Sequence, residues 1–204
     1  MRTSLSLVLA ALAIPAAAQE SRQLDAHEHG VGELNIAFEG NIMAMELHVP
    51  GADIVGFEHA ATSAEDRTAI ENAVATLARP LELFVLPEGA ECTVTQASAE
   101  LESEESHDQH EEHEEHDDHD DHADDDGHED HAEEHHEDEA GHTEFHAEYT
   151  LTCAHPGAIT GFKFAYFDVF QNARELEVQI VSTSGARAFE VERDAPTLDL
   201  RGMF

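Results

Sequence analysis

Residues 31–49 read VGELNIAFEGNIMAMELHV, and the alternation of apolar and polar residues in this stretch decides the fold. Pairing two strands about a turn at Gly40 and Asn41 gathers the apolar side chains on one face, namely Leu34, Ile36, Phe38, Met43, Met45 and Leu47. The other face carries Glu33, Asn35, Glu46 and His48, and in this register Glu33 lies directly across from His48. The stretch therefore predicts an antiparallel hairpin with its apolar face on a core.

The residues that follow predict one helix. Pro50 and Gly51 end the second strand, and Thr62 with Glu65 forms a capping box. Apolar residues then recur at helical spacing until Arg79 and Pro80, at Ile70, Val74 and Leu77. Short strands are expected over residues 81–86, 159–170, 175–181 and 186–191, with a turn at Ser184 and Gly185 and a turn or single helical turn near 168–172. Strands predominate, so the predicted class is α+β with a mainly antiparallel sheet.

Two cysteines flank an unusual insertion. Cys92 and Val94 lead a strand that reaches Leu101, and alternating residues from Phe145 to Cys153 form a strand after the insertion. If the strands pair with Cys92 opposite Cys153, Val94 faces Leu151 and Gln96 faces Tyr149. The insertion, residues 106–142, then becomes a long hairpin loop, which a paired base tolerates because closure entropy grows only with the logarithm of loop length. In an exported protein the pair favours a disulfide, and a thiolate metal site is the competing interpretation.

The insertion and the start of the next strand are dense in metal ligands. Residues 107–146 hold twenty carboxylates, no Lys or Arg, and no apolar side chain larger than Ala before Phe145, so the loop is expected to be disordered. Imidazole and carboxylate groups at this density bind divalent cations such as Zn²⁺ in flexible, overlapping sets. Twelve of the seventeen histidines lie there: His107, His110, His113, His116, His119, His122, His128, His131, His135, His136, His142 and His146.

The first residues predict export. Residues 1–18 combine a basic start, a short apolar run and small residues ending at Ala18, which is typical of a signal peptide cleaved after Ala18. Residues 19–105 and 143–204 are then expected to form a single zinc-binding domain. The mature protein is expected to be soluble and periplasmic. The net charge of -37 makes nucleic acid and anionic membranes poor partners, and no later segment is expected to insert into a membrane.

A more ordered metal site is expected on the domain itself. In an extended chain His27 and His29 face the same way and can converge on one ion. Because zinc needs three or four ligands, further ones are sought among the remaining candidates, His48, Glu58, His59, Glu33 and His155. No H-E-x-x-H, nucleophile elbow or phosphate loop occurs, so the chain is expected to be a binding protein and not an enzyme.

Together these residues resemble a known family. His27-x-His29-Gly30 before the hairpin, Gly56-Phe57-Glu58-His59 after Pro50, the capped helix and a His-rich insertion between cysteine-bearing strands are similar to the ZrgA-like periplasmic zinc-uptake proteins. The resemblance implies a bacterial periplasmic protein that works beside a high-affinity zinc ABC importer or its periplasmic binding protein. It marks His27, His29 and the Glu58–His59 pair as motif residues.

Two alternatives stay open beside capture, buffering and delivery of Zn²⁺. The first is a copper or nickel protein of storage or resistance, because Cu²⁺ binds such ligands more tightly than Zn²⁺ whatever the biological metal is. The second is an interaction protein whose acidic loop docks a basic partner.

Overall fold

The computed structural model describes residues 28–103 and 142–203. The described chain is mostly β-sheet. Its larger sheet has six strands in the order β4-β5-β2-β1-β7-β8. These strands are β1 (Val31–Glu39), β2 (Ile42–Pro50), β4 (Cys92–Ser103), β5 (Thr143–Cys153), β7 (Glu175–Ser182) and β8 (Gly185–Glu192). All neighbours are antiparallel except β1 and β7, which are parallel.

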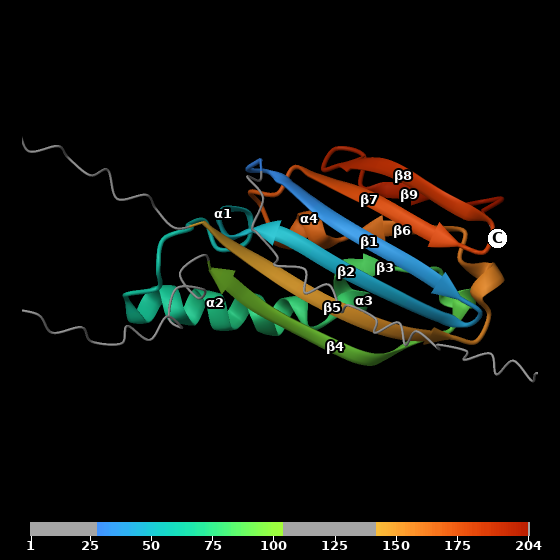
Figure 1. Ribbon diagram of the computed structural model, residues 1–204, viewed down its shortest axis with the longest axis horizontal. Helices are drawn as coiled ribbons and strands as arrows, with labels where there is room; N and C mark the ends of the chain where they lie inside the picture. The colour runs from blue at the N-terminus through green and yellow to red at the C-terminus, as the bar shows by residue number, and fades with distance from the viewer. Residues whose placement is uncertain (1–27, 104–141, 204) are drawn as a thin grey trace, which may run out of the picture.

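A second layer lies on one face of this sheet, behind it in the view of Figure 1. It contains a three-stranded sheet in the order β3-β6-β9, formed by β3 (Phe84–Val85), β6 (Gly161–Phe164) and β9 (Thr197–Asp199). Its helices are α1 (Gly51–Ile54), α2 (Ala64–Leu77), α3 (Pro80–Leu83) and α4 (Tyr166–Val169), and 3₁₀ turns occupy Glu88–Ala90 and Pro156–Ala158. The predicted mainly antiparallel sheet is thus present, and α2 is the one helix of more than four residues in the described ranges.

The core fills the space between the two layers. The apolar face predicted for the β1–β2 hairpin is buried, apart from Phe38, which is partly buried. Glu33 pairs with His48 across the hairpin, as the alternation predicts. Aromatic rings of the second layer pack under the sheet, with Phe84 stacked on Tyr166 and edge-on to Phe164. The opposite face of β2 and β5 is therefore left to polar side chains.

The disulfide between Cys92 and Cys153 is present, so neither cysteine is available as a thiolate ligand. β4 and β5 pair as predicted from Cys92 opposite Cys153 to Val94 opposite Leu151. The predicted Gln96–Tyr149 pair is wrong. A β-bulge between Val94 and Gln96 shifts the register, so that Gln96 faces Thr150 and Ala97 faces Tyr149.

Two local predictions are corrected. Ser63, not Thr62, caps α2: the Asp66 amide donates to Ser63 Oγ at 3.0 Å, and the Ser63 amide donates to the Asp66 carboxylate at 3.1 Å. The capping box is thus shifted by one residue, because the sequence offers the same spacing twice. Residues 81–86 are not one strand, since Pro80 stands at the start of the helical turn α3 and leaves only Phe84–Val85 for β3.

Candidate metal centre

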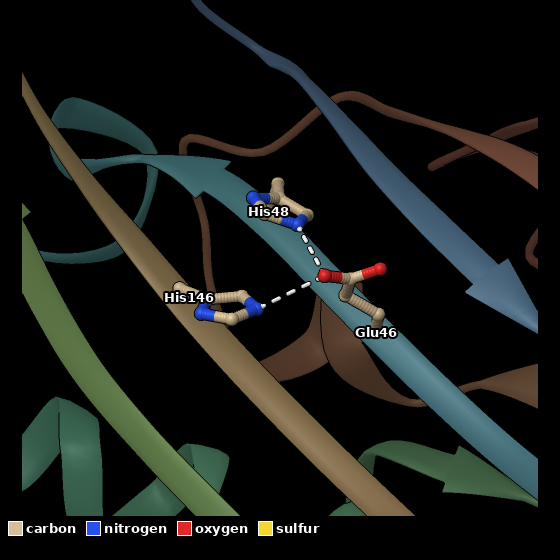
Figure 2. A group of neighbouring side chains, drawn as sticks. All are labelled: Glu46, His48 and His146. Atoms are coloured by element: carbon tan, nitrogen blue, oxygen red, sulfur yellow. Dashed lines mark ion pairs between the residues drawn. The ribbon is translucent and has the colours of Figure 1, made fainter. Parts of the chain in front are cut away.

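Three ligand-type side chains meet on the polar face of the large sheet. Glu46 and His48 are two residues apart on β2, so both point away from the core. His146 lies directly opposite His48 on β5, and the two imidazole rings stack with centroids 4.5 Å apart. Figure 2 shows Glu46 and His48 rising from β2 and His146 turning toward them from β5. These residues, Glu46, His48 and His146, are called the sheet centre below.

One carboxylate oxygen lies between the two histidines of the sheet centre. Glu46 Oε1 lies 3.3 Å from His48 Nε2 and 3.3 Å from His146 Nε2. Ligand atoms at the corners of a zinc tetrahedron are separated by about 3.3 Å, since each lies about 2.0 Å from the ion. The three atoms also lie within 4.8 Å of one another. The spacing and donor types fit a divalent cation bound by two imidazoles and one carboxylate.

The other ring nitrogen of each histidine faces a second carboxylate. His48 Nδ1 lies 3.5 Å from Glu144 Oε2, and His146 Nδ1 lies 3.6 Å from Glu102 Oε1. Metal-binding histidines usually donate their remaining N–H to a carboxylate, which fixes the tautomer and orients the ring. Glu144 and Glu102 stand where such partners are needed, so both Nε2 atoms are directed toward Glu46.

The carboxylates also set the protonation of the sheet centre. The hydrogen bond with Glu144 raises the pKa of His48, and this effect outweighs the partial burial that lowers it. Burial raises the pKa of Glu46, but the hydrogen bonds and charges of His48 and His146 outweigh it and leave that pKa lowered. Glu46 is therefore an anion at neutral pH, ready to bind a cation.

His146 belongs to a second possible group with Glu100 and Glu102 of β4. The His146 nitrogen that faces Glu102 of that group is Nδ1, at 3.6 Å from Oε1. A neutral imidazole has one lone pair, so binding through Nδ1 requires the proton to sit on Nε2, and the reverse. One ion held by neutral His146 is thus bound either with Glu46 and His48 or with Glu100 and Glu102.

A separate set of residues gathers around Glu58, in the loop between α1 and α2. Glu58 Oε2 lies 3.1 Å from His29 Nε2 and 3.2 Å from His142 Nδ1. The Glu58 side chain is only 10% exposed, whereas His29 and His142 are 60% and 55% exposed. Glu58, His29 and His142 are called the loop cluster below.

A family model matches residues 26–200, nearly all of the described chain, and it describes zinc uptake proteins. The chain belongs to the ZrgA family. The resemblance inferred from the sequence motifs is thereby confirmed, and with it a role connected with zinc. A search of curated proteins returned no match. Among the residues that the structure describes, no helix has the length and apolar character needed to cross a bilayer.

In this ZrgA-family chain the predicted candidates separate into different places. His48 and His146 join the sheet centre, and His29, Glu58 and His142 form the loop cluster. His59 stacks on Phe57 and its Nδ1 lies 3.0 Å from the Ala60 carbonyl oxygen, and exposed His155 lies 3.7 Å from Glu91. Neither these two residues nor the loop cluster occurs among the described groups whose ligand atoms all lie within 4.8 Å of one another. His27 and ten histidines of the insertion lie outside the described residues: His107, His110, His113, His116, His119, His122, His128, His131, His135 and His136.

Three residues of the sheet centre and its surroundings escaped the sequence interpretation. The alternation places Glu46 on the polar face of the hairpin but gives it no role, and no sequence pattern marks Glu102 or Glu144 as partners. His146 was assigned to the insertion, although its alternation with Phe145 and Ala147 puts it on the polar face of β5. The pairing of β2 with β5 would have joined these residues, but local sequence patterns do not specify which strands become neighbours.

Proposed function

We propose that this protein is an exported, periplasmic zinc-binding protein that captures and buffers Zn²⁺ and hands it to a high-affinity uptake system. The observation that carries the proposal is Glu46 Oε1 lying 3.3 Å from both His48 Nε2 and His146 Nε2, with a carboxylate behind each ring. Membership of a zinc uptake family supports zinc as the cargo. The Cys92–Cys153 disulfide and the signal-like residues 1–18 support export.

The sheet centre suits capture and release better than permanent structural binding. Structural zinc sites are closed by four protein ligands, whereas the described part of the chain supplies three at the sheet centre, and in the proposal the fourth position is taken by water or an incoming ligand. An open position lets a ligand of the acceptor attack the ion before the protein ligands leave. The same openness is found in catalytic zinc sites. We propose binding without catalysis because the sequence carries no H-E-x-x-H, nucleophile elbow or phosphate loop.

The His-rich insertion adds capacity in this proposal. Its histidines and carboxylates supply many weak sites, because ordering a flexible chain around each ion costs conformational entropy. The insertion joins the described fold at Ser103 and His142, and β4 and β5 carry Glu102 and His146 close to these ends. Ions held by the insertion are thus delivered to the same end of the sheet as the sheet centre.

Zinc binding is tested with the mature full-length protein after the metal has been removed with a chelator. In neutral buffer the protein is expected to retain several equivalents of zinc in equilibrium dialysis, of which at least one resists a competing chromogenic chelator. His48→Gln should remove one chelator-resistant equivalent, and His155→Gln, an exposed histidine outside the centre, should remove none. If the stripped protein leaves all of the offered zinc free, the proposed function is wrong.

The two alternatives have their own outcomes. Removing residues 106–141 while circular dichroism shows an unchanged fold should lower the number of weakly bound ions; unchanged capacity would favour an acidic loop that docks a basic partner. The metal that controls expression, and not the measured affinity, distinguishes zinc from copper and nickel, because Cu²⁺ binds most nitrogen sites more tightly. Expression that rises on zinc starvation supports zinc, whereas expression controlled by copper or nickel would overturn it.

A further inference from the structure

The loop cluster shares one feature with the sheet centre, and it takes its residues from three other parts of the chain. In each, one carboxylate oxygen lies between nitrogen atoms of two histidines, at 3.1 and 3.2 Å around Glu58 and at 3.3 Å twice around Glu46. Each of these separations is close to the edge of about 3.3 Å expected for a zinc tetrahedron. The ligand atoms of the loop cluster do not all lie within 4.8 Å of one another, however, so its two exposed histidines must approach each other when an ion binds. His29 precedes β1, Glu58 follows α1, and His142 precedes β5.

The backbone that follows His29 is fixed by contacts of Gly30. The Gly30 amide donates to both carboxylate oxygens of Asp53, at 2.8 and 2.9 Å, and Asp53 is only 3% exposed. The Gly30 carbonyl accepts hydrogen bonds from the amides of Arg174 and Glu175. Gly30 has φ +96°, and a Cβ there would lie 3.0 Å from the Arg174 side chain, so a glycine is required. The backbone at His29 is thus held in place before any ion binds, while its exposed side chain stays accessible.

The segments that carry Glu58 and His142 are packed against one glycine. A Cβ on Gly51, the first residue of α1, would lie 2.2 Å from Thr143 Oγ1 and 3.0 Å from the Phe57 carbonyl oxygen. Thr143 follows His142 and Phe57 precedes Glu58, so the absence of a side chain at residue 51 lets these neighbours approach α1 together. Ligands positioned in advance lose less entropy when an ion binds.

We propose that Glu58, His29 and His142 form a second zinc position, distinct from the sheet centre. The proposal rests on the proposed function, since it takes zinc as the cargo. The histidines of this position are exposed while the carboxylate is nearly buried, so ions reach it from the surface of the protein. His142 is also the first described residue after the insertion, so an ion bound here ties the end of the insertion to the starts of β1 and α2.

The experiment follows the reactivity of single histidines in the full-length protein. Diethyl pyrocarbonate modifies free imidazole nitrogen, and tandem mass spectrometry gives the modification rate at each residue. With zinc at ten times its half-saturating concentration, the rates at His29 and His142 are expected to fall about tenfold, since about nine-tenths of the positions are occupied. His155 lies beyond the other end of β5 and should react equally with and without zinc.

Three substitutions decide between coordination and simple hydrogen bonding. Glu58→Gln keeps the size of the side chain and should abolish the zinc effect at both His29 and His142, whereas the charge-matched Glu82→Gln on the surface should not. His29→Gln should abolish the effect at His142, a residue more than one hundred positions away. Because His29 is largely exposed, this variant folds even if Glu58→Gln does not. Glu46→Gln should leave the effect intact and so separate the two centres.

The outcomes against the proposal are distinct from failure of the proposed function. If dialysis shows bound zinc but the rates at His29 and His142 do not change, the second position is wrong and zinc binding elsewhere stands. A zinc effect at His142 that survives both Glu58→Gln and His29→Gln also overturns it, because the ion is then held by other ligands. If no zinc is retained in dialysis, both proposals are wrong.

Discussion

Reducing the Cys92–Cys153 disulfide should lower the free energy of unfolding by about 4 kcal/mol in the metal-free protein. The bond closes a loop with a sequence separation of 61 residues, most of which belong to the His-rich insertion. In the chain-entropy description a cross-link removes freedom from the unfolded state in proportion to the logarithm of loop length, giving about 3 kcal/mol for about 15 residues and about 4.7 for about 100. The separation here lies between these values.

The same description predicts how the insertion changes this contribution. Removing residues 106–141 leaves a separation of about 25 residues, which lowers the contribution of the disulfide by about 0.8 kcal/mol. The difference is measured as a cycle of four proteins, with and without the insertion and with the disulfide oxidised or reduced. Urea unfolding followed by circular dichroism is suitable, because the chain has no tryptophan for fluorescence.

A chelator must be present throughout, since zinc bound to the folded state would add its own stabilisation. If reduction costs less than about 1 kcal/mol, the unfolded chain is already compact enough to make the cross-link redundant. If the contribution of the disulfide grows when the insertion is removed, the entropic reasoning is wrong. The first result would also mean that the β4–β5 ladder, which places Glu102 near His146, holds without help from the disulfide.

Two further predictions concern the sheet centre and α2. Protons compete with zinc for imidazole, and the hydrogen bond with Glu144 raises the pKa of His48, so zinc affinity measured by chelator competition should fall steadily from about pH 7.5 to about pH 5; equal affinity at both ends would contradict it. In the metal-free protein the raised pKa stabilises the fold fully below about pH 6.5, and this contribution is lost as the pH rises through the folded-state pKa. Ser63→Ala should cost about 1 kcal/mol in urea unfolding because it removes the cap of α2, whereas Thr62→Ala should cost less than about 0.5. A larger cost for Thr62→Ala would mean that the capping box is misplaced.

The parts of the fold that depend on short-range patterns were predictable. Alternation alone predicts the β1–β2 hairpin with Glu33 opposite His48, and the expected export together with two cysteines on facing strands predicts the disulfide. The bulge in β4 left a signal that the sequence interpretation missed. Cys92, at an even position, packs against the core, and Val94, although exposed, pairs with the buried Leu151, whereas Ala97, Ala99 and Leu101 pack against the core from odd positions. When the core-facing residues of one strand change from even to odd positions, the strand must contain an extra residue, which is a β-bulge.

The sheet centre was less predictable, because it depends on pairing between strands far apart in sequence. Glu46 and His48 come from β2, and His146 comes from β5, about one hundred residues later. No local pattern states that β5 inserts between β2 and β4, or that β7 pairs with β1 in parallel. The density of histidine in the insertion also groups His146 with its neighbours in sequence, whereas the fold groups it with its neighbours in the sheet.

The start of β5 links the two proposed zinc positions. His142, Glu144 and His146 are two residues apart, so one stretch of extended chain supplies a histidine to the loop cluster, the carboxylate behind His48, and a histidine of the sheet centre. Four residues of strand span about 13 Å. The two positions therefore lie within about two Debye lengths of each other at physiological salt. An ion that leaves one position stays in the field of a strongly acidic protein and is close to the ligands of the other. Transfer along β5 then needs exchange of a few imidazole and carboxylate ligands and no change of fold, which is what a carrier that must both hold and release zinc requires.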